Sequence, residues 1–182
     1  MNGQANLAWR ARPEKVLPAL LAQAHVLAMV FAPPFAVALA ERAWSMAAAL
    51  GLALVPPLAG VALARRFPPG RDLRQIEAVA VLVLLFLAAA ALGVPALMVL
   101  GLSPVDAVFE SVSAITSTGL SVASGTMDWP LSGHALRAWM QWCGGFAIAL
   151  AGVALILGPG AARGAASRLG RAGLTEGERD IL

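Results

Sequence analysis

Charged side chains are scarce in this sequence. Asp, Glu, Lys and Arg make up 13% of its 182 residues, 59% are hydrophobic, and the mean hydropathy is +0.78. Soluble domains carry about 25% charged and about 45–50% apolar residues. The composition therefore argues against a soluble enzyme, a disordered tail and a nucleic-acid-binding domain. The net charge of +3 arises from 13 basic residues set against only 10 acids.

The sequence also has almost no cysteine and no cluster of catalytic residues. Cys143 is the single cysteine, which excludes an internal disulfide and a cysteine-rich metal site. No paired carboxylates, metal-ligand cluster or nucleophile with an adjacent base occurs at a usable spacing. We therefore expect neither enzymatic activity nor a covalently bound cofactor.

Long uncharged runs are what the sequence has instead. Four stretches contain no Asp, Glu, Lys or Arg: 16–40, 43–64, 78–105 and 138–162. A bilayer core about 30 Å thick is spanned by about 20 apolar residues, so each run is long enough to cross. The sequence predicts an all-α integral membrane protein with four transmembrane helices.

The predicted segments follow from these runs. They are a cytoplasmic N-terminus (1–15), two membrane helices (16–64), a basic cytoplasmic loop (65–75), a unit of two membrane helices around a short polar segment (76–157) and a flexible cytoplasmic tail (158–182). Within that unit we expect a membrane helix (76–101), a half-length helix (104–114), an extended segment (116–119), an external loop (120–133) and a second membrane helix (134–157).

The basic residues predict the orientation. If all four runs span, eleven of the 13 lie on one side, and Arg42 and Arg137 lie on the other. Basic residues flanking membrane helices concentrate on the cytoplasmic side. We therefore expect both termini in the cytoplasm and residues 102–137 outside, or dipping in from outside.

A short helix is predicted within this outer segment. Ser103 suits an N-cap, Pro104 suits the first helical position, and Asp106 stands three residues after the cap. Apolar residues then recur with a helical period to about Ala114. Eleven residues reach roughly 16 Å, about half the bilayer core.

The end of this helix carries the functional hypothesis. A half-length helix entering from outside ends at mid-membrane, where its carbonyls need a protein or water-filled cavity and where the helix dipole favours a cation. Thr116-Ser117-Thr118-Gly119 follows, and backbone carbonyls can replace the hydration shell of potassium. The alternative is a helix lying at the outer membrane interface, beside a wet loop.

Two motifs resemble a known family. Asp106-Ala-Val-Phe-Glu-Ser-Val-Ser-Ala-Ile-Thr-Ser-Thr-Gly119 is similar to the first pore loop of TrkH-type potassium uptake proteins, in the Trk/Ktr/HKT superfamily. Leu136-Arg-Ala-Trp-Met-Gln-Trp-Cys-Gly-Gly145 resembles the start of the helix that follows that loop. The order of elements also matches: two helices, a basic loop and then a unit of helix, pore helix, filter and helix.

The resemblance implies a role in potassium uptake across a bacterial inner membrane. The implied filter ligands for a dehydrated K⁺ are the backbone carbonyls of Thr116, Ser117, Thr118 and Gly119. The implied partners are the lipid bilayer, a second copy of the complete transporter and a cytoplasmic nucleotide-binding regulatory ring of the TrkA kind. K⁺ would be the transported ion, and we expect no nucleic acid.

The sequence contains one such pore unit, whereas the family has four around one pore. The remaining units would come from a longer chain of which this is a fragment, from a separately encoded chain, or from further copies in a homo-oligomer. The rival functions are a non-conducting membrane scaffold or inactive truncated remnant, and a subunit of a Na⁺-selective or non-selective cation channel.

Three residues near the filter are candidates for its support, and two more for helix packing. Glu110 either holds the filter segment by hydrogen bonds or faces water at the outer mouth. Arg137 either braces the pore helix or snorkels at the interface, and Gln141 is expected to hydrogen-bond between helices. Gly144 and Gly145 form a small-residue face for close helix packing, with a hinge as the alternative.

Overall fold

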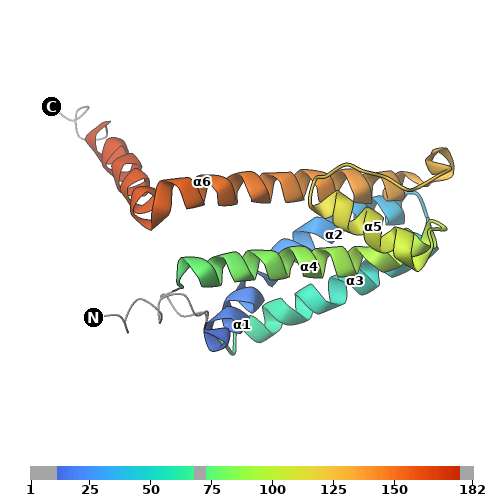
Figure 1. The fold of residues 1–182 in the computed structure, drawn as a ribbon, viewed down its shortest axis with the longest axis horizontal. Coiled ribbons are helices and arrows are strands. Elements are labelled where there is room, and N and C mark those ends of the chain that lie inside the picture. The colour runs from blue at the N-terminus through green and yellow to red at the C-terminus, as the bar shows by residue number, and fades with distance from the viewer. Residues whose placement is uncertain (1–11, 68–72, 177–182) are drawn as a thin grey trace, which may run out of the picture. The chain divides into compact units, whose positions relative to one another are not determined.

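The computed structural model describes the backbone of residues 12–67 and 73–176, and the side chains of these residues up to 154. This part of the chain contains helices and no strand. The α-helices are α1 (Pro13–Ala22), α2 (Ala24–Ala40), α3 (Trp44–Ala64), α4 (Gln75–Val99), α5 (Pro104–Ile115) and α6 (Leu131–Glu176), with a 3-10 turn, η1 (Thr126–Asp128), before α6 (Figure 1).

The chain divides into two compact units, Met1–Gly144 and Gly145–Leu182. The first unit holds α1 to α5 and the first turns of α6, and it contains all the predicted site residues except Gly145. The second unit consists of the remainder of α6 and the residues after it. Each unit is described by itself.

Three stretches of helix are long and apolar enough to cross a membrane. They are Pro13–Ala40, which combines α1 and α2, Trp44–Ala64 and Gln75–Val99. The all-helical class and these spans agree with the sequence analysis and indicate a membrane protein. The fourth predicted membrane helix, 134–157, falls inside α6 and stays a prediction.

The helix boundaries differ from the prediction in three places. A break at Gln23 separates α1 from α2, and α6 begins at Leu131 rather than at 134. The tail is helical up to Glu176, and its predicted flexibility stays a prediction. Alanine and arginine are strong helix formers, and in this segment they outweigh the glycines that suggested flexibility.

Prolines lie inside each of the helices α1 to α4 without ending them. In α2, Pro33 has no N–H, so the Met29 carbonyl one turn earlier lacks its usual helical partner. The indole Nε1 of Trp139, on α6, donates a hydrogen bond of 3.0 Å to that carbonyl. The proline therefore provides an acceptor through which α6 is joined to α2.

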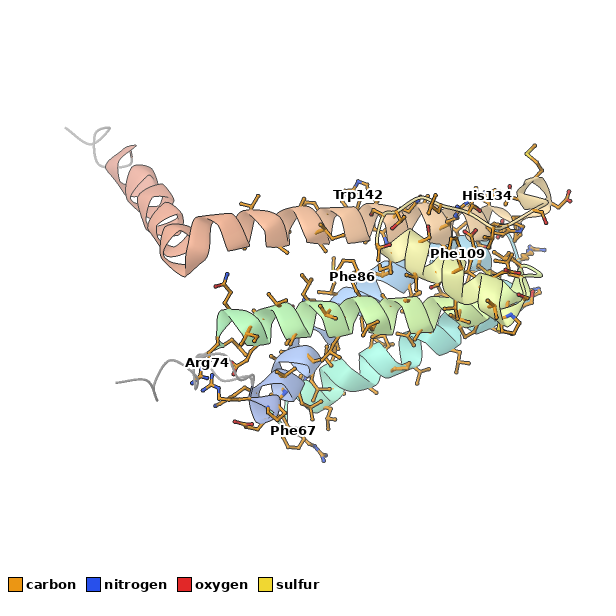
Figure 2. All side chains as sticks on the ribbon, viewed as in Figure 1. Phe67, Arg74, Phe86, Phe109, His134 and Trp142 are labelled. Atoms are coloured by element: carbon orange, nitrogen blue, oxygen red, sulfur yellow. The ribbon has the colours of Figure 1, made fainter. Side chains whose placement is uncertain are left out.

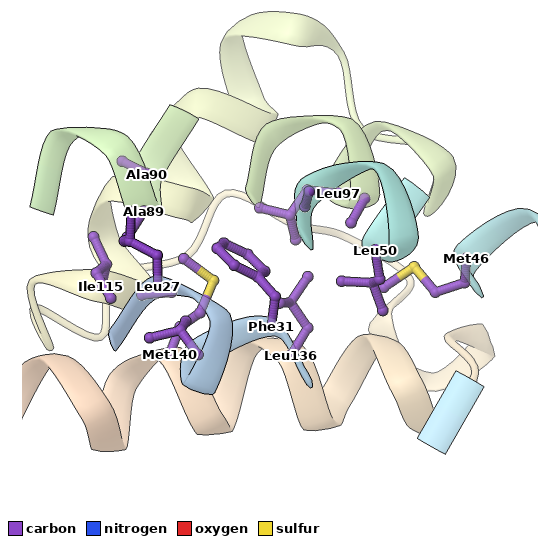
Figure 3. Packing of buried hydrophobic residues seen from close by; sticks show 14 of the residues in the cluster. Leu27, Phe31, Met46, Leu50, Ala89, Ala90, Leu97, Ile115, Leu136 and Met140 are labelled. Atoms are coloured by element: carbon purple, nitrogen blue, oxygen red, sulfur yellow. The ribbon is translucent and has the colours of Figure 1, made fainter. Parts of the chain in front are cut away.

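The core of the first unit lies where α2, α3, α4 and α6 meet. Phe31, Leu50, Leu97, Leu136 and Met140 are fully buried there or nearly so, and Figure 3 shows them projecting toward one another from these four helices. Ile115, at the end of α5, closes the same cluster. The core thus fixes the helices against which α5 packs.

A buried ion pair holds the beginning of α4. Glu77 is fully buried, and its Oε1 lies 2.6 Å from Arg12 Nε, while its Oε2 accepts from Arg12 Nη2 at 2.9 Å. The backbone amides of Arg12 and Arg74 donate to the same carboxylate at 3.1 and 2.9 Å. Arg74 is labelled at this end of α4 in Figure 2. These bonds tie the residue before α1 to α4, and they satisfy a carboxylate that would be costly to bury alone.

Candidate functional site

Helix α5 begins as its sequence predicts. Ser103 is the N-cap: its Oγ accepts from the Asp106 amide at 3.2 Å and donates to Asp106 Oδ2 at 2.7 Å. Pro104 occupies the first helical position, where its missing N–H costs nothing. The helix ends at Ile115, one residue beyond the predicted end at 114.

The carboxyl end of α5 lies beside the middle of two longer helices. Ser111 Oγ donates to the Ala90 carbonyl at 2.6 Å, and Ala90 stands roughly 14 Å back from the end of α4 at 1.5 Å per residue. Ile115, one turn further along α5, contacts Gly144, which is roughly 20 Å from the start of α6. Helix α5 therefore doubles back along α4, as Figure 1 shows.

Two glycines make room for α5 in this position. A Cβ on Gly144 would collide with the backbone carbonyl of Ile115, and a Cβ on Gly93 would collide with the hydroxyl of Ser111. The first obstacle is rigid backbone and the second is a side chain with a rotatable bond. Gly144 is thus the tighter of the two contacts, and close packing is what it does in this structure.

The residues after α5 form a helix-ending turn. The Thr118 amide donates to the Ser113 carbonyl and the Ser117 amide to the Ala114 carbonyl, both at 3.0 Å, which is the Schellman pattern. Ser117 has φ = 56°, a left-handed conformation usually reserved for glycine. Its hydroxyl donates to the backbone carbonyl of Gln141, which anchors the strained residue to α6. Thr116 and Ser117 are therefore not extended, contrary to prediction, because the turn uses them to end the helix.

Gly119 also has a left-handed backbone, with φ = 77°. A Cβ there would lie 3.5 Å from Gln141 Nε2, an ordinary contact, so conformation rather than space requires glycine. Thr116 and Thr118 face each other, with their hydroxyl oxygens 2.7 Å apart. The four predicted filter residues thus form one compact turn at the end of α5.

The carbonyl oxygens of this turn differ from those on either side of it. Within the described part of the chain, no hydrogen bond ends on the carbonyls of residues 116–119. Those of Val112, Ser113, Ala114 and Leu120 each accept at least one. The described residues also contain no group of three His, Cys, Asp or Glu side chains suited to a metal.

Glu110 holds the segment that follows the turn. It is fully buried, and its Oε1 accepts from the Ser121 hydroxyl at 2.6 Å and from the Val122 and Ala123 amides at 2.6 and 3.1 Å. Its Oε2 receives no hydrogen bond in the described structure but lies 3.0 Å from Arg137 Nε. The Arg137 charge therefore balances the carboxylate from α6.

The other predicted support residues are placed as follows. Arg137 Nη2 also reaches the Leu120 carbonyl at 3.5 Å. Gln141 contacts the turn through its backbone carbonyl, and its side-chain amide makes no hydrogen bond within the described residues. Gly145 belongs to the second unit. The structure thus places Gln141 and Gly144 against the end of α5 and its turn, and Glu110 and Arg137 against residues 120–123.

Sequence reasoning missed three residues of this site. Ser113 Oγ donates to the Leu120 carbonyl at 2.6 Å, Ser121 binds Glu110, and Ser111 joins α5 to α4. The serines at 111 and 113 stand five and three residues before the predicted filter. Small hydroxyl residues on this short, largely apolar helix are the signal that could have found them.

Comparison with known proteins gives one partial similarity. Over 55 residues, which are 30% of this chain, the sequence is 44% identical to the "Trk system potassium uptake protein TrkH" of Halomonas elongata. That relative is a potassium uptake protein. The match covers 11% of its length. No family model and no solved structure matches the chain. At this coarse level the similarity favours a Trk-type potassium transporter over an enzyme.

Proposed function

We propose that this chain contributes one ion-binding segment to a potassium uptake pore in a bacterial inner membrane. The observation that carries the proposal is the run of carbonyls at 116–119 that accept no hydrogen bond in the described chain. A filter needs oxygen atoms that are held in place yet unoccupied, so that they can replace water around a dehydrated ion. The partial similarity to TrkH points to K⁺ as that ion.

The position of α5 supports a pore helix that enters from outside. Its carboxyl end lies beside the middle of α4, a helix of 25 residues whose length of roughly 38 Å exceeds the bilayer core. With α4 spanning the membrane, the turn at 116–119 would lie near mid-depth. The negative end of the α5 dipole would then face the ion. A helix lying flat at the interface would not double back along α4.

The outward side of α5 supports the need for further pore units. Val105, Val108, Phe109 and Val112 are between 40% and 78% exposed, and Figure 2 labels Phe109 on this helix. One segment cannot surround an ion, so equivalent units would complete the site. They would come from the same longer chain, a separate chain or further copies of this one. A transporter homodimer and a nucleotide-binding ring remain predictions from the family resemblance. The cytoplasmic placement of both termini remains a prediction from the distribution of basic residues.

The decisive test replaces Gly119 by valine in the assembled protein. Valine cannot adopt the left-handed backbone of Gly119 without strain, so we expect the carbonyls to turn away from the ion. Uptake of K⁺ would be measured in cells that lack other potassium uptake systems, with Na⁺ uptake measured in parallel. We expect K⁺ uptake to fall to background.

Gly125 offers a matched control. It has φ = 72°, and a Cβ there would meet nothing within 4 Å, so Gly125→Val introduces the same kind of strain outside the turn. The two variants differ in location rather than in chemistry. Undiminished K⁺ uptake in Gly119→Val, or equal losses in both variants, would contradict the filter assignment. Equal passage of Na⁺ and K⁺ in the unmodified protein would contradict selectivity for potassium.

A further inference from the structure

The first turn of α6 is capped by a residue about 90 positions away in the sequence. Glu41 Oε2 accepts from the Leu131 amide and Glu41 Oε1 from the Ser132 amide, both at 2.9 Å. These amides belong to the first helical turn, whose N–H groups have no partner inside the helix. Both oxygens of one carboxylate are thus committed to a single helix end, where the helix dipole also favours a negative charge.

Glu41 is itself held in a tight connection. It follows α2 directly, and α3 begins three residues later at Trp44. The Glu41 amide donates to the Val37 carbonyl at 3.0 Å and the Ala43 amide to the Ala38 carbonyl at 3.0 Å. Arg42 adopts a left-handed backbone with φ = 60°. The carboxylate therefore projects from a well-defined turn rather than from a loose loop.

The start of α6 is also seated against α4. Ser132 is fully buried, and a Cβ on Gly133 would lie 3.0 Å from the side chain of Leu100, just after α4. Glu41 and Leu100 thus define the position of this helix end from two sides. Arg137 follows about one and a half turns later, roughly 8 Å along the axis.

Arg137 links the start of α6 to residues 120–123, which we call the filter exit. It lies 3.0 Å from the buried Glu110 Oε2 and 3.5 Å from the Leu120 carbonyl. Glu110 in turn accepts from the amides of Val122 and Ala123. A shift of the α6 terminus would therefore be felt at the filter exit through direct contacts, of which that between Arg137 and Leu120 is the longest.

We propose that Glu41 is a positioning residue for the filter: by capping α6 from the α2–α3 turn, it places Arg137 where Glu110 and Leu120 need it. This inference rests on the proposed function for its effect on ions, but the coupling from Glu41 to the filter exit does not. The sequence around residues 116–119 gives no hint of this role, because α3 and α4 lie between Glu41 and that segment in the chain.

The test compares Glu41→Ala, Glu41→Gln and Asp128→Asn in the intact assembly. Alanine removes both acceptors and glutamine retains one. Asp128 is an exposed carboxylate near the start of α6 that caps nothing in the described structure, so it controls for a general loss of surface charge. The first readout is hydrogen exchange at the Val122 and Ala123 amides. The second is the ratio of K⁺ to Na⁺ uptake.

We expect the rate of hydrogen exchange at the filter exit to rise about tenfold in Glu41→Ala, because the loss of one helix cap changes an equilibrium by about that factor. The rise should be smaller in Glu41→Gln. The K⁺ to Na⁺ ratio should fall in the same order, with Asp128→Asn unchanged. Unchanged exchange in Glu41→Ala would overturn the coupling. Raised exchange with an unaltered ion ratio, or the same changes in Asp128→Asn, would overturn the positioning role. Should Gly119→Val leave potassium uptake intact, the proposed function fails, and exchange alone decides the coupling.

Discussion

Residues 116–119 and the filter exit at 120–123 are neighbours in the chain but are held in opposite ways. In the first segment the amides of Thr116, Ser117 and Thr118 donate back into α5, and the carbonyls accept nothing within the described chain. In the filter exit, the Leu120 carbonyl and two amides are bound by polar side chains from α5 and α6. The difference teaches that polar side chains from α5 and α6 fix residues 120–123, whereas residues 116–119 are fixed through their own amides and hydroxyl groups. Under the proposed function, the carbonyls at 116–119 are then available to an ion.

Of the single substitutions, Gly144→Ala should disturb this arrangement most. A methyl group there would displace the Ile115 carbonyl, and the turn that begins at Thr116 with it. We expect the free energy of unfolding to fall by about 3 kcal/mol, as for severe overpacking, and potassium uptake to be lost. Thermal unfolding in detergent and uptake in cells measure the two effects.

Gly152→Ala is the matched control for that variant. Gly152 stands on the same helix, and a Cβ there meets nothing within 4 Å. Alanine also favours helix over glycine by about 1 kcal/mol, so Gly152→Ala should be neutral or slightly stabilising. Equal stability of the two variants would show that the contact between Ile115 and Gly144 does not hold α5 in place.

Arg137→Ala is the next largest perturbation, and it acts on the filter exit. It leaves Glu110 Oε2 buried without a compensating charge, because that oxygen has no hydrogen bond in the described structure. We expect a loss of about 2 kcal/mol in unfolding free energy, below the full cost of breaking a buried pair because Arg137 is partly exposed. Chemical denaturation in detergent measures it.

The double variant that combines Arg137→Ala with Glu110→Gln tests the cause of this loss. The glutamine oxygen can still accept from Val122 and Ala123, while the unbalanced charge is gone. The double variant should therefore be more stable than Arg137→Ala alone. Additive losses would mean that the two side chains do not act as a pair.

Trp139→Phe should have a smaller effect, away from both segments. It removes the indole donor to the Met29 carbonyl that Pro33 leaves without a helical partner. A lost hydrogen bond of this kind costs about 1 kcal/mol. Adding Pro33→Ala supplies a backbone N–H for that carbonyl, so Trp139→Phe should cost less in that background. Thermal unfolding of the four proteins measures the difference, and an equal cost in both backgrounds would contradict the role given to the proline.

The smallest expected effect is a pH dependence at Glu41. The nearby Ser132 hydroxyl, together with the Ser132 and Leu131 amides, lowers the pKa of Glu41 below its ordinary value of 4.5, against an opposing effect of desolvation. Since the folded pKa is the lower one, the stabilisation is complete above about pH 4.5 and is lost as the pH falls through the lowered pKa. Between pH 7 and pH 5.5 nothing should change.

Unfolding midpoints of the wild type and Glu41→Gln, measured from pH 7 to pH 3, test this dependence. The difference between the two proteins should be constant at neutral pH and should shrink in acid. A difference that grows on acidification would contradict the sign of the pKa shift.

Local signals in the sequence predicted α5 well. Ser103, Pro104 and Asp106 mark its beginning, and the structure places its end within one residue of the expected position. These signals succeed because a helix N-terminus is satisfied by residues next to it in the chain. The helix over 158–176 was not anticipated, because the glycines among the alanines and arginines of this segment masked their helix propensity.

The support of the site depends on contacts that no local pattern reveals. The start of α6 was placed three residues too late because its cap, Glu41, lies some 90 residues earlier. Likewise, Gln141 contributes a backbone carbonyl rather than its side chain, and Ser117 adopts a conformation that glycine usually supplies. Each of these depends on which helices meet, and a single sequence does not contain that information in readable form.

The length of α5 determines where its C-terminal turn lies relative to the partners of Glu110. Inserting one residue between Glu110 and Ile115 would advance the turn by about 1.5 Å and rotate it by about 100°, so Glu110 would no longer meet the exit that it binds. Adding a whole turn would keep the side chains of α5 on the same faces. It would, however, move the Ile115 carbonyl and the turn after it beyond Gly144. Insertions and deletions in this helix should therefore be far less tolerated than in the loop between Ser124 and Pro130.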